Sequence, residues 1–499
     1  MQALYDIGGF TSCPAPFNLA AHVLGQAGVA PDKIALQVLG GPALSYGALE
    51  QAVRGTGTGL LQAGLVPGDI LLMRLGNTPD FPIAYLGAIA AGVIPVPTSS
   101  QLTEREVAGM VADLAPAAIL HDPSIPSAAG PRHITLSELR AMRDLPQCDW
   151  SIGAPDRLAY MVYTSGTSGA PRAVAHAHRA IWARQMMIRD WYDLHAEDRM
   201  LHAGAFNWTY TLGTGVMDPW TVGATALIPS PGTLPEALPD LLAEHRATIF
   251  AAAPGVYRKL LRADLSPLPD LRHGLCAGEK LSDPIRQAWQ EATGTALYEA
   301  YGMSECSTFI SAAPGRPAKG EALGRPQRGR RVAIVDESGT PVAHDAPGVI
   351  AVHRSDPGLM LGYPTAPEDT RARFAGEWFL TGDMGVMDTD GQISYLGRND
   401  DMMNAGGYRV SPLEVETALA SHPGILEIGV TDVEAKADAR IIAAFYSGPA
   451  PLDPDALAAY VKERLARYKQ PRAFIYLPEL PRGPNGKLLR RALRAHFRV

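Results

Sequence analysis

The sequence has little cysteine for its length. Four cysteines occur among 499 residues, and Cys13, Cys148, Cys276 and Cys306 lie far apart, without a CxxC spacing or a neighbouring histidine pattern. This distribution excludes the zinc sites that short cysteine and histidine motifs form. It favours a reducing compartment, so we predict a cytoplasmic protein.

Long hydrophobic runs are also lacking. Residues 1–17 contain neither a basic segment nor an apolar segment of the kind found in secretory signals. The longest apolar run, about 83–96, is interrupted by glycine and contains Pro95. We therefore expect no membrane partner.

Positive charge is not in excess. Forty-four Lys and Arg residues stand against 51 Asp and Glu, a formal charge of −7, which provides no general attraction to nucleic acid or to anionic lipid. Any bound phosphate must therefore be held locally. The 46% hydrophobic content and the aperiodic distribution of 50 Gly and 42 Pro are typical of a globular, loop-rich chain of two to four folding units.

Helix-like and strand-like stretches alternate along most of the chain, which predicts an α/β fold with mainly parallel sheets. One helix is expected to bury Leu49, Val53, Leu60 and Leu61 on one face. The expected strands include 69–74, 117–121, 158–162, 224–228 and 248–251, and the later helices 235–245 and 284–292. Shorter segments with Gly/Pro turns over about 319–397 predict a small β-barrel-like region, and a further α/β domain follows from about Asp400.

The stretch Tyr163-Thr-Ser-Gly-Thr-Ser-Gly-Ala-Pro-Arg172 follows an expected strand. Its hydroxyls, its glycine backbone and the cation of Arg172 would suit a polyphosphate. An isolated run of this kind is more often an ordinary surface turn, and it does not match the GxxxxGK[ST] phosphate loop.

Four further motifs follow in order: Tyr301-Gly-Met-Ser-Glu305, Trp378-Phe-Leu-Thr-Gly-Asp383, Gly397-Arg-Asn-Asp-Asp401 with Ala405-Gly-Gly-Tyr-Arg409, and Pro481-Arg-Gly-Pro-Asn-Gly-Lys487. Together with the first stretch they resemble the ANL superfamily of adenylate-forming enzymes over nearly the whole chain. Trp208, followed by Gly-Val-Met-Asp-Pro-Trp-Thr-Val-Gly-Ala224, is similar to the acyl-CoA synthetases for medium-chain and aromatic acids.

The resemblance implies a large N-terminal adenylation domain over 1–397, with two α/β sheet units and the small β-barrel-like region. It also implies a small, mobile α/β C-terminal domain over 398–499, with a hinge near Asp400. A short polar junction between two cores is a reasonable place for such a hinge.

The resemblance also implies which residues contact the nucleotide. In the family, the acid at Glu305 binds the Mg2+ of MgATP, Asp383 accepts hydrogen bonds from the ribose, and the ammonium of Lys487 assists attack on the α-phosphate. Thr164, Glu305 and Lys487 are the expected catalytic residues. The expected nucleotide-binding residues are Thr164, Ser165, Gly166, Thr167, Ser168, Gly169, Arg172, Gly278, Glu279, Lys280, Glu299, Ala300, Tyr301, Gly302, Met303, Ser304, Asp383, Arg398 and Lys487.

The carboxylic acid is expected to lie among neutral and aromatic residues. Amino-acid-activating relatives place an Asp directly after the pocket aromatic, whereas Thr209 follows Trp208 in this sequence, so an α-amino acid substrate is not expected. The expected acid-binding residues are Phe206, Asn207, Trp208, Tyr210, Gly278 and Gly302. CoA is expected at Gly406, Gly407, Tyr408 and Arg409, where a glycine leaves room for the pantetheine arm.

The sequence departs from the family pattern at three positions. Arg172 replaces the usual Lys of the phosphate loop, Ala173 replaces Gly, and Ser168 replaces Thr. Charge and hydroxyl are retained, but Arg is a forked donor rather than a point charge, which leaves the phosphate geometry at this position open.

Competing interpretations fail on particular residues. A nucleophile elbow would need Gly at Cys306, and a dinucleotide fingerprint beginning at Gly55 would need Gly at Leu60. A degenerate, non-enzymatic scaffold would have lost one of the key polar residues, and all of them are present. The resemblance therefore implies an AMP-forming carboxylic acid:CoA ligase that uses ATP, Mg2+ and CoA through an acyl-adenylate. The alternative is acyl delivery to a carrier-protein thiol, and the oligomeric state stays open.

Overall fold

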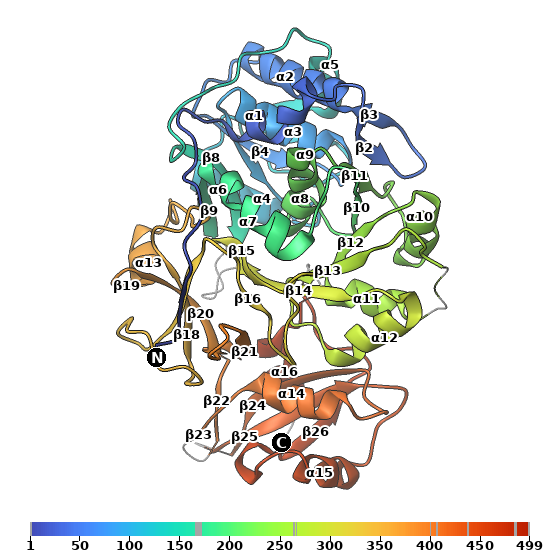
Figure 1. Ribbon diagram of the computed structural model, residues 1–499, viewed down its shortest axis with the longest axis vertical. Helices are drawn as coiled ribbons and strands as arrows, with labels where there is room; N and C mark the ends of the chain where they lie inside the picture. Colours follow the sequence, from blue (N-terminus) through green and yellow to red (C-terminus); the bar gives the residue numbers. More distant parts are fainter. Residues whose placement is uncertain are drawn as a thin grey trace. The chain divides into compact units, whose positions relative to one another are not determined.

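Figure 1 shows the protein as a computed structural model. The structure describes residues 2–164, 172–262, 265, 267–399, 401–405, 408–436, 439–483 and 487–497. For 164, 404, 405, 408, 409, 436 and 439 it describes the backbone alone. Two compact units are present: unit 1 comprises Met1–Leu4, Val332–Ala351 and Leu380–Val499, and unit 2 comprises Tyr5–Arg331 and Val352–Phe379. The boundary at 397/398 therefore stays a prediction.

The largest sheet of unit 2 has nine strands in its described part, in the order β16-β15-β14-β13-β12-β10-β11-β2-β3. The strands from β14 to β2 pair in parallel, and the outer pairs are antiparallel. Its strands are β2 (Ile34–Val38), β3 (Ala43–Ser45), β10 (Arg199–His202), β11 (Thr225–Ile228), β12 (Ile249–Ala252), β13 (His273–Ala277), β14 (Leu297–Met303), β15 (Ser307–Ser311) and β16 (Arg325–Pro326). Every residue of β11, β12 and β13 is buried, as expected where helices cover both faces of a parallel sheet.

A second sheet in unit 2 is entirely parallel, in the order β5-β4-β6-β7. It consists of β4 (Ile70–Arg74), β5 (Ile94–Pro97), β6 (Ala118–His121) and β7 (Arg132–Thr135), and β8 (Leu158–Thr164) and β9 (Arg172–Ala177) form a separate antiparallel pair. The predicted α/β class and parallel sheets are confirmed. The sequence pattern did not reveal that β2 and β3, from the first part of the chain, join the sheet formed mainly by the second part.

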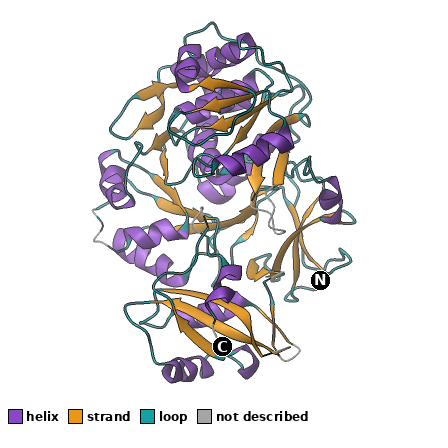
Figure 2. Ribbon diagram, turned by 180° about the vertical axis from the view of Figure 1, so that it is seen from behind, coloured by secondary structure: helices purple, strands orange, loops and turns teal. Residues whose placement is uncertain are grey.

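Helices surround these strands (Figure 2). They are α1 (Leu19–Val23), α2 (Tyr46–Gln62), α3 (Asp80–Ala90), α4 (Glu104–Leu114), α5 (Leu136–Met142), α6 (Arg179–Ala183), α7 (Gln185–Met187), α8 (Thr209–Leu212), α9 (Asp218–Val222), α10 (Leu238–Glu244), α11 (Pro254–Leu260), α12 (Asp283–Thr293) and α13 (Pro367–Ala372). Short 3-10 helices span Gly25–Gly28 and Pro235–Ala237, and π-helical segments span Ile188–Tyr192 and Gly213–Met217. No helix in the described part of the chain is long and apolar enough to cross a membrane.

Helix α2 buries Leu49, Val53 and Leu60 as predicted. The prediction that Leu61 is buried is wrong, because this residue is 39% exposed. Residue 61 lies one position beyond the buried face, about 100° around the helix from Leu60. The glycines of this helix are packing positions. A Cβ at Gly59 would lie 2.1 Å from a Met142 side-chain carbon, so glycine lets α5 approach α2 closely.

Unit 1 contains most of a six-stranded sheet in the order β1-β17-β18-β20-β19, with β21 paired to β20. Five of these strands come from the region, about 319–397, predicted to be β-barrel-like; among the described residues they form an open sheet with β1 at one edge. Its strands are β1 (Leu4–Asp6), β17 (Arg331–Val335), β18 (Gly348–His353), β19 (Phe374–Ala375), β20 (Trp378–Met387) and β21 (Ile393–Arg398).

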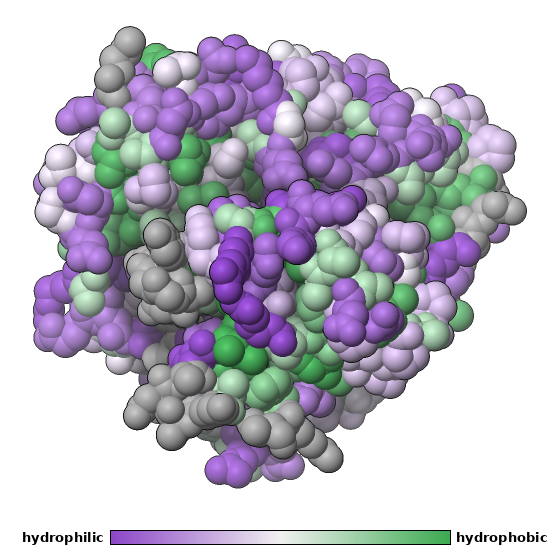
Figure 3. All heavy atoms as spheres, turned by 90° about the horizontal axis from the view of Figure 1, so that it is seen from below, coloured by the Kyte–Doolittle hydropathy of each residue, from purple (hydrophilic) through white to green (hydrophobic). Residues whose placement is uncertain are grey.

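The last hundred residues add a smaller α/β body to unit 1. Its strands are β22 (Met403–Ala405), β23 (Tyr408–Val410), β24 (Glu427–Lys436), β25 (Ala439–Ser447) and β26 (Ala473–Tyr476), and its helices are α14 (Pro412–Ala420), α15 (Pro454–Lys462), α16 (Arg490–Leu493) and the 3-10 turns Arg467–Lys469 and Arg494–His496. Strands β24, β25 and β26 form one sheet, whose core includes Val430, Ala444 and Leu457. The face in Figure 3 mixes hydrophilic and hydrophobic residues, without one class covering it.

Candidate active site

The two strands of a β-hairpin flank the hydroxyl-rich segment 165–171 in the sequence. Strands β8 and β9 pair so that Thr164 lies opposite Arg172, at the end of the ladder. Ser165, Gly166, Thr167, Ser168 and Gly169 lie outside the described residues, as does the side chain of Thr164. The strand predicted before the loop is therefore present, and a second strand follows it directly.

Arg172 and Glu305 both contact Tyr363. The guanidinium of Arg172 lies 5.7 Å from the centroid of the Tyr363 ring and 2.7 Å from Asp369 Oδ2. The Tyr363 hydroxyl donates a 2.6 Å hydrogen bond to Glu305 Oε1. Burial and the neighbouring Glu305 carboxylate raise the pKa of Tyr363, which keeps it a donor. The sequence patterns did not identify Tyr363 or Asp369, because both lie about sixty residues beyond the Tyr301 motif without a local signal.

Glu305 can accept a divalent cation. Its side chain is buried, its Oε1 accepts the Tyr363 hydrogen bond, and Oε2 makes no hydrogen bond or ion pair within the described part of the chain. The described residues contain no cluster of three or more His, Cys, Asp or Glu side chains suited to a metal. A single carboxylate fits Mg2+ when substrate phosphates and water supply the other ligands, so the residues present fit MgATP.

Strand β14 contains the predicted residues Glu299 to Met303, and Ser304 begins the short turn that follows it. The ladder to β15 shifts register between Tyr301 and Gly302. A Cβ at Gly302 would lie 2.1 Å from the carbonyl oxygen of Ser307, so only glycine fits there. The Tyr301 ring packs edge-on against Phe309 at 5.3 Å. Ser304 also lines the pocket described below.

Gly278 and Trp208 are in direct contact, although seventy residues separate them. Gly278 has a φ of +98°, and a Cβ at this position would lie 2.6 Å from the Trp208 ring. Trp208 also packs edge-on against Tyr210 at 5.2 Å. Tyr210 is buried, and its hydroxyl donates to the carbonyl of Leu275 at 3.2 Å. The structure therefore brings three predicted acid-site residues together.

The turn after Gly278, which carries the predicted nucleotide-binding residues Glu279 and Lys280, is fixed by an ion pair. Lys280 Nζ lies 3.1 Å from Glu299 Oε2 and donates to the carbonyl of Glu321. Glu299 Oε1 accepts from the backbone amide of Leu281. Lys280 and Glu299 therefore orient this turn through their side chains.

A pocket opens within unit 2 between the end of β14 and the segment after β10. Most of its walls are apolar or aromatic. Its lining residues are Leu19, Tyr85, Pro97, Tyr160, Val162, His176, Ile181, Arg184, Phe206, Asn207, Thr209, Leu212, Met217, Ser304 and Ser307. Of the residues predicted to bind the acid, Phe206 and Asn207 line this pocket, and Trp208, Tyr210, Gly278 and Gly302 are not among its lining residues; their roles stay predictions.

One wall of the pocket is a stacked pair of neutral rings. Tyr160 and His176 stack with centroids 4.9 Å apart and 15° between their planes. Burial raises the pKa of Tyr160 to about 12 and lowers the pKa of His176 to about 4. His176 Nε2 contacts the carbonyl of Ser304 at 2.8 Å, which joins this wall to the turn that carries Glu305.

Unit 1 contains the other predicted nucleotide contacts. Asp383 and Arg398 are paired across β20 and β21, with Arg398 Nε 3.5 Å from Asp383 Oδ1. Lys487 is exposed, and its carbonyl accepts from the amide of Gly483. Gly406, Gly407 and the predicted hinge residue Asp400 lie outside the described residues, as do the side chains of Tyr408 and Arg409 in β23.

Comparisons with known proteins agree with these motifs. The family model named AMP-binding enzyme matches residues 24–364, and the model of its C-terminal domain matches residues 414–487. The 3-hydroxybenzoate–CoA ligase of Aromatoleum sp. (strain CIB) is 30% identical over 488 residues, which cover 91% of this chain and 92% of that protein.

Two solved structures are similar over nearly their whole length. A benzoate CoA ligase from Burkholderia xenovorans LB400 aligns with a TM-score of 0.86 and 27% identity, covering 96% of this chain and 100% of that chain. An anthranilate CoA ligase in complex with anthranoyl-AMP aligns with a TM-score of 0.88 and 25% identity, covering 97% and 98%.

Proposed function

Because this chain belongs to the family of AMP-binding enzymes, we propose that it is an AMP-forming carboxylic acid:CoA ligase acting on an aromatic or medium-chain acid. The observation that carries this proposal is the pocket in unit 2. Its mainly apolar and aromatic walls reach the turn that holds Ser304 and Glu305. ATP and CoA are the co-substrates, and Mg2+ accompanies ATP.

The reaction has two steps. A carboxylate oxygen attacks the α-phosphorus of ATP, the bond from that phosphorus to the bridging oxygen breaks, and pyrophosphate leaves with the electron pair. The CoA thiol then loses its proton and attacks the acyl carbon, and AMP leaves as the thioester forms.

The residues of this chain divide the work in the first step. The apolar pocket orients the acid and excludes water from it. Glu305, held by Tyr363, would ligate Mg2+, which neutralises phosphate charge when it is bound. We assign the ribose to Asp383 and Arg398, the phosphates to the loop between Thr164 and Arg172, and the attacking carboxylate to the Lys487 ammonium.

The second step calls for a different set of residues. We propose that residues 398–499 form a mobile domain with a hinge near Asp400, and that Gly406, Gly407, Tyr408 and Arg409 bind CoA. Under this assignment Lys487 serves adenylation and the Gly407 segment serves thiolysis. A cytoplasmic location is part of the same proposal. Transfer to a carrier protein is not favoured, because the similar proteins are CoA ligases.

The test is pyrophosphate release across a panel of benzoates and aliphatic acids, each with and without CoA, together with mass spectrometry of the thioester. We expect ATP-dependent pyrophosphate release for at least one acid, and acyl-CoA and AMP in equal amounts once CoA is present. ATP cleavage to ADP, or the absence of thioester for every acid, would contradict the proposal.

A further inference from the structure

The lining of the proposed acid pocket includes one arginine and a serine that bond to each other. Arg184 and Ser307 both line the pocket, and Arg184 Nη1 donates to Ser307 Oγ at 2.5 Å. Arg184 follows α6, whereas Ser307 begins β15, 123 residues later. A guanidinium is an unusual group to find in the wall of a pocket for an apolar acid, because it must be taken out of water.

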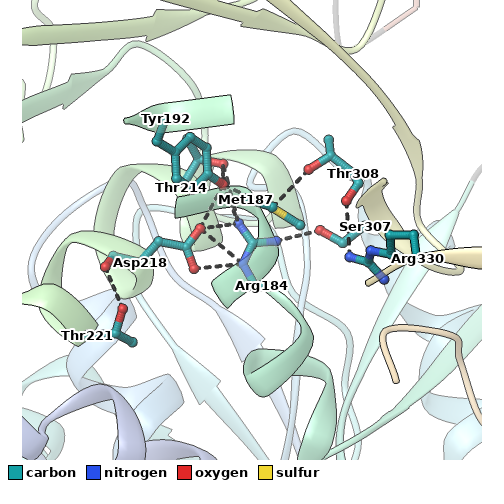
Figure 4. Close-up of polar contacts among 9 residues, drawn as sticks. All are labelled: Arg184, Met187, Tyr192, Thr214, Asp218, Thr221, Ser307, Thr308 and Arg330. Carbon is teal, nitrogen blue, oxygen red and sulfur yellow. Dashed lines mark hydrogen bonds and ion pairs between the residues drawn. The ribbon is translucent and has the colours of Figure 1, made fainter. Parts of the chain in front are cut away.

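A buried network holds this guanidinium in place (Figure 4). Arg184 Nε donates to Asp218 Oδ1 at 2.8 Å, and Nη2 donates to Asp218 Oδ2 at 2.6 Å. The side chains of Arg184 and Asp218 are only 7% and 2% exposed. Nη2 also reaches the hydroxyls of Tyr192 and Thr214 at 3.2 and 3.3 Å. The Nε and Nη2 atoms of the guanidinium are therefore held in place by several hydrogen bonds.

The backbone around Arg184 is shaped to admit it. Tyr192 and Thr214 belong to two π-helical segments. Such segments are rare in proteins overall, and those that occur are often found at functional sites. A Cβ at Gly213 would lie 2.2 Å from Arg184 Nη2, so the guanidinium occupies the space of a missing side chain. Ser307 has a φ of +62°, a conformation that L side chains rarely adopt. The π-helical segments, the glycine at 213 and the positive φ of Ser307 therefore all surround the same guanidinium.

The network leaves hydrogen-bonding capacity at the pocket. Nη1 carries two N–H groups, and within the described part of the chain it makes one hydrogen bond, to Ser307. Ser307 Oγ accepts that bond and retains a second lone pair and its own proton. An oxygen placed between these groups could accept from Nη1 and donate to Ser307 Oγ. A hydroxyl does both.

We propose that Arg184 and Ser307 recognise a hydroxyl group on the acid, so that the preferred substrates are hydroxy-substituted aromatic acids. This inference rests on the proposed function. The charge of Arg184 is already balanced by Asp218, which favours a neutral hydroxyl over a second carboxylate. The flat Tyr160–His176 wall suits a ring rather than a flexible chain.

The test compares kcat/KM for benzoate, 3-hydroxybenzoate, 4-hydroxybenzoate, isophthalate, terephthalate and octanoate in the pyrophosphate assay with CoA. The parent protein should prefer one hydroxybenzoate to benzoate by about 10- to 100-fold, the usual range for one well-placed polar contact. A preference for benzoate, a dicarboxylate or octanoate would overturn the inference and leave the ligase proposal standing. Failure of every acid would overturn both.

Two variants then locate the preference. The double variant Arg184→Met/Asp218→Asn removes both charges together, and should lower the hydroxybenzoate-to-benzoate ratio to about one while benzoate turnover persists. Ser307→Ala, which removes only one hydroxyl, should lower that ratio by about tenfold and serves alone if the double variant does not fold. Thr221→Val is the matched control, because the Thr221 hydroxyl donates to the backbone carbonyl of Asp218 and Thr221 is not among the residues that line the pocket. An unchanged ratio in a folded Arg184→Met/Asp218→Asn or Ser307→Ala protein would make the network purely structural and overturn the inference.

Discussion

The acid pocket and the nucleotide-binding residues are built in opposite ways. The pocket gathers side chains from α1, α3, β5, β8, β9, α6 and the segment 206–217, and its fixed polar group, Arg184, is buried. The predicted nucleotide contacts come in short consecutive motifs on turns and strand ends, and Arg172, Arg398 and Lys487 are partly or fully exposed. If the proposed assignments hold, the three cations expected at the nucleotide are accessible to solvent, whereas the arginine expected at the acid is fixed in the interior.

The largest effect is expected at Lys487, on the nucleotide side. In Lys487→Ala the ammonium that offsets charge during attack on the α-phosphorus is lost, so adenylation should fall by about 100-fold or more. Thioester formation from synthetic acyl-AMP and CoA should continue near the parent rate, because no phosphorus is attacked in that step. The two half-reactions are measured separately, by pyrophosphate release and by loss of free thiol. An equal loss of both half-reactions would contradict the proposal that Lys487 serves adenylation and not thiolysis.

The next effect tests the interior. Arg184→Lys keeps the charge but replaces a two-edged fork by a point donor, so the contacts to Asp218 and Ser307 cannot all be made. We expect a loss of about 2 to 4 kcal/mol of unfolding free energy, near the range for a broken buried ion pair. Urea unfolding followed by fluorescence measures it. A change below about 0.5 kcal/mol, the range of neutral surface substitutions, would mean that the network is not fixed as described.

The motifs and the strand pattern could be predicted because they are local. The expected strands at 69–74, 117–121 and 248–251 correspond to β4, β6 and β12, and the helix at 284–292 to α12. Arg184, Asp218 and Tyr363 could not be found in this way. The contacts Arg184–Asp218, Tyr363–Glu305 and Arg184–Ser307 join residues 34, 58 and 123 positions apart, and no spacing rule relates such positions. The roles of the individual site residues stay predictions until the variants are measured.

A third effect concerns the ribose. Asp383→Ala removes the carboxylate paired with Arg398, which we expect to bind the ribose diol. Hydrogen bonds to a charged group contribute about 1.5 to 3 kcal/mol each, so ATP should bind at least tenfold more weakly. Calorimetry with ATP and a non-reacting acid analogue measures this. Asp383→Asn is the control and should lose less, because its amide oxygen still accepts one hydrogen bond.

The interior should also respond to pH. His202, at the end of β10, is buried, and neither ring nitrogen has a hydrogen-bond partner in the described structure. Burial lowers its pKa to about 3, so between pH 6.5 and 3 the unfolded chain binds a proton that the native fold refuses. Stability is therefore complete above about pH 6.5 and falls as the pH drops, by about 2 kcal/mol at pH 5 from this residue. His202→Leu should make Tm less dependent on pH over that interval, with the remaining dependence due to other buried histidines such as His176. Replacing the exposed His195 by Gln should leave the dependence unchanged.

The smallest effect is expected for Arg172→Lys, which makes at the nucleotide side the same exchange that Arg184→Lys makes in the interior. Arg172 pairs with Asp369, but the two side chains are 22% and 42% exposed, and such ion pairs contribute about 0 to 1 kcal/mol. A lysine at this position can reach a phosphate as a point charge, so KM for ATP should change by no more than about threefold. The stability of the protein should change even less. If Arg172→Lys instead raised KM for ATP far more than threefold, the forked guanidinium of Arg172 would hold its ligand in a fixed geometry that lysine cannot reproduce. The exposure of an arginine would then not predict whether its fork geometry matters for function. The contrast between the two regions would not hold.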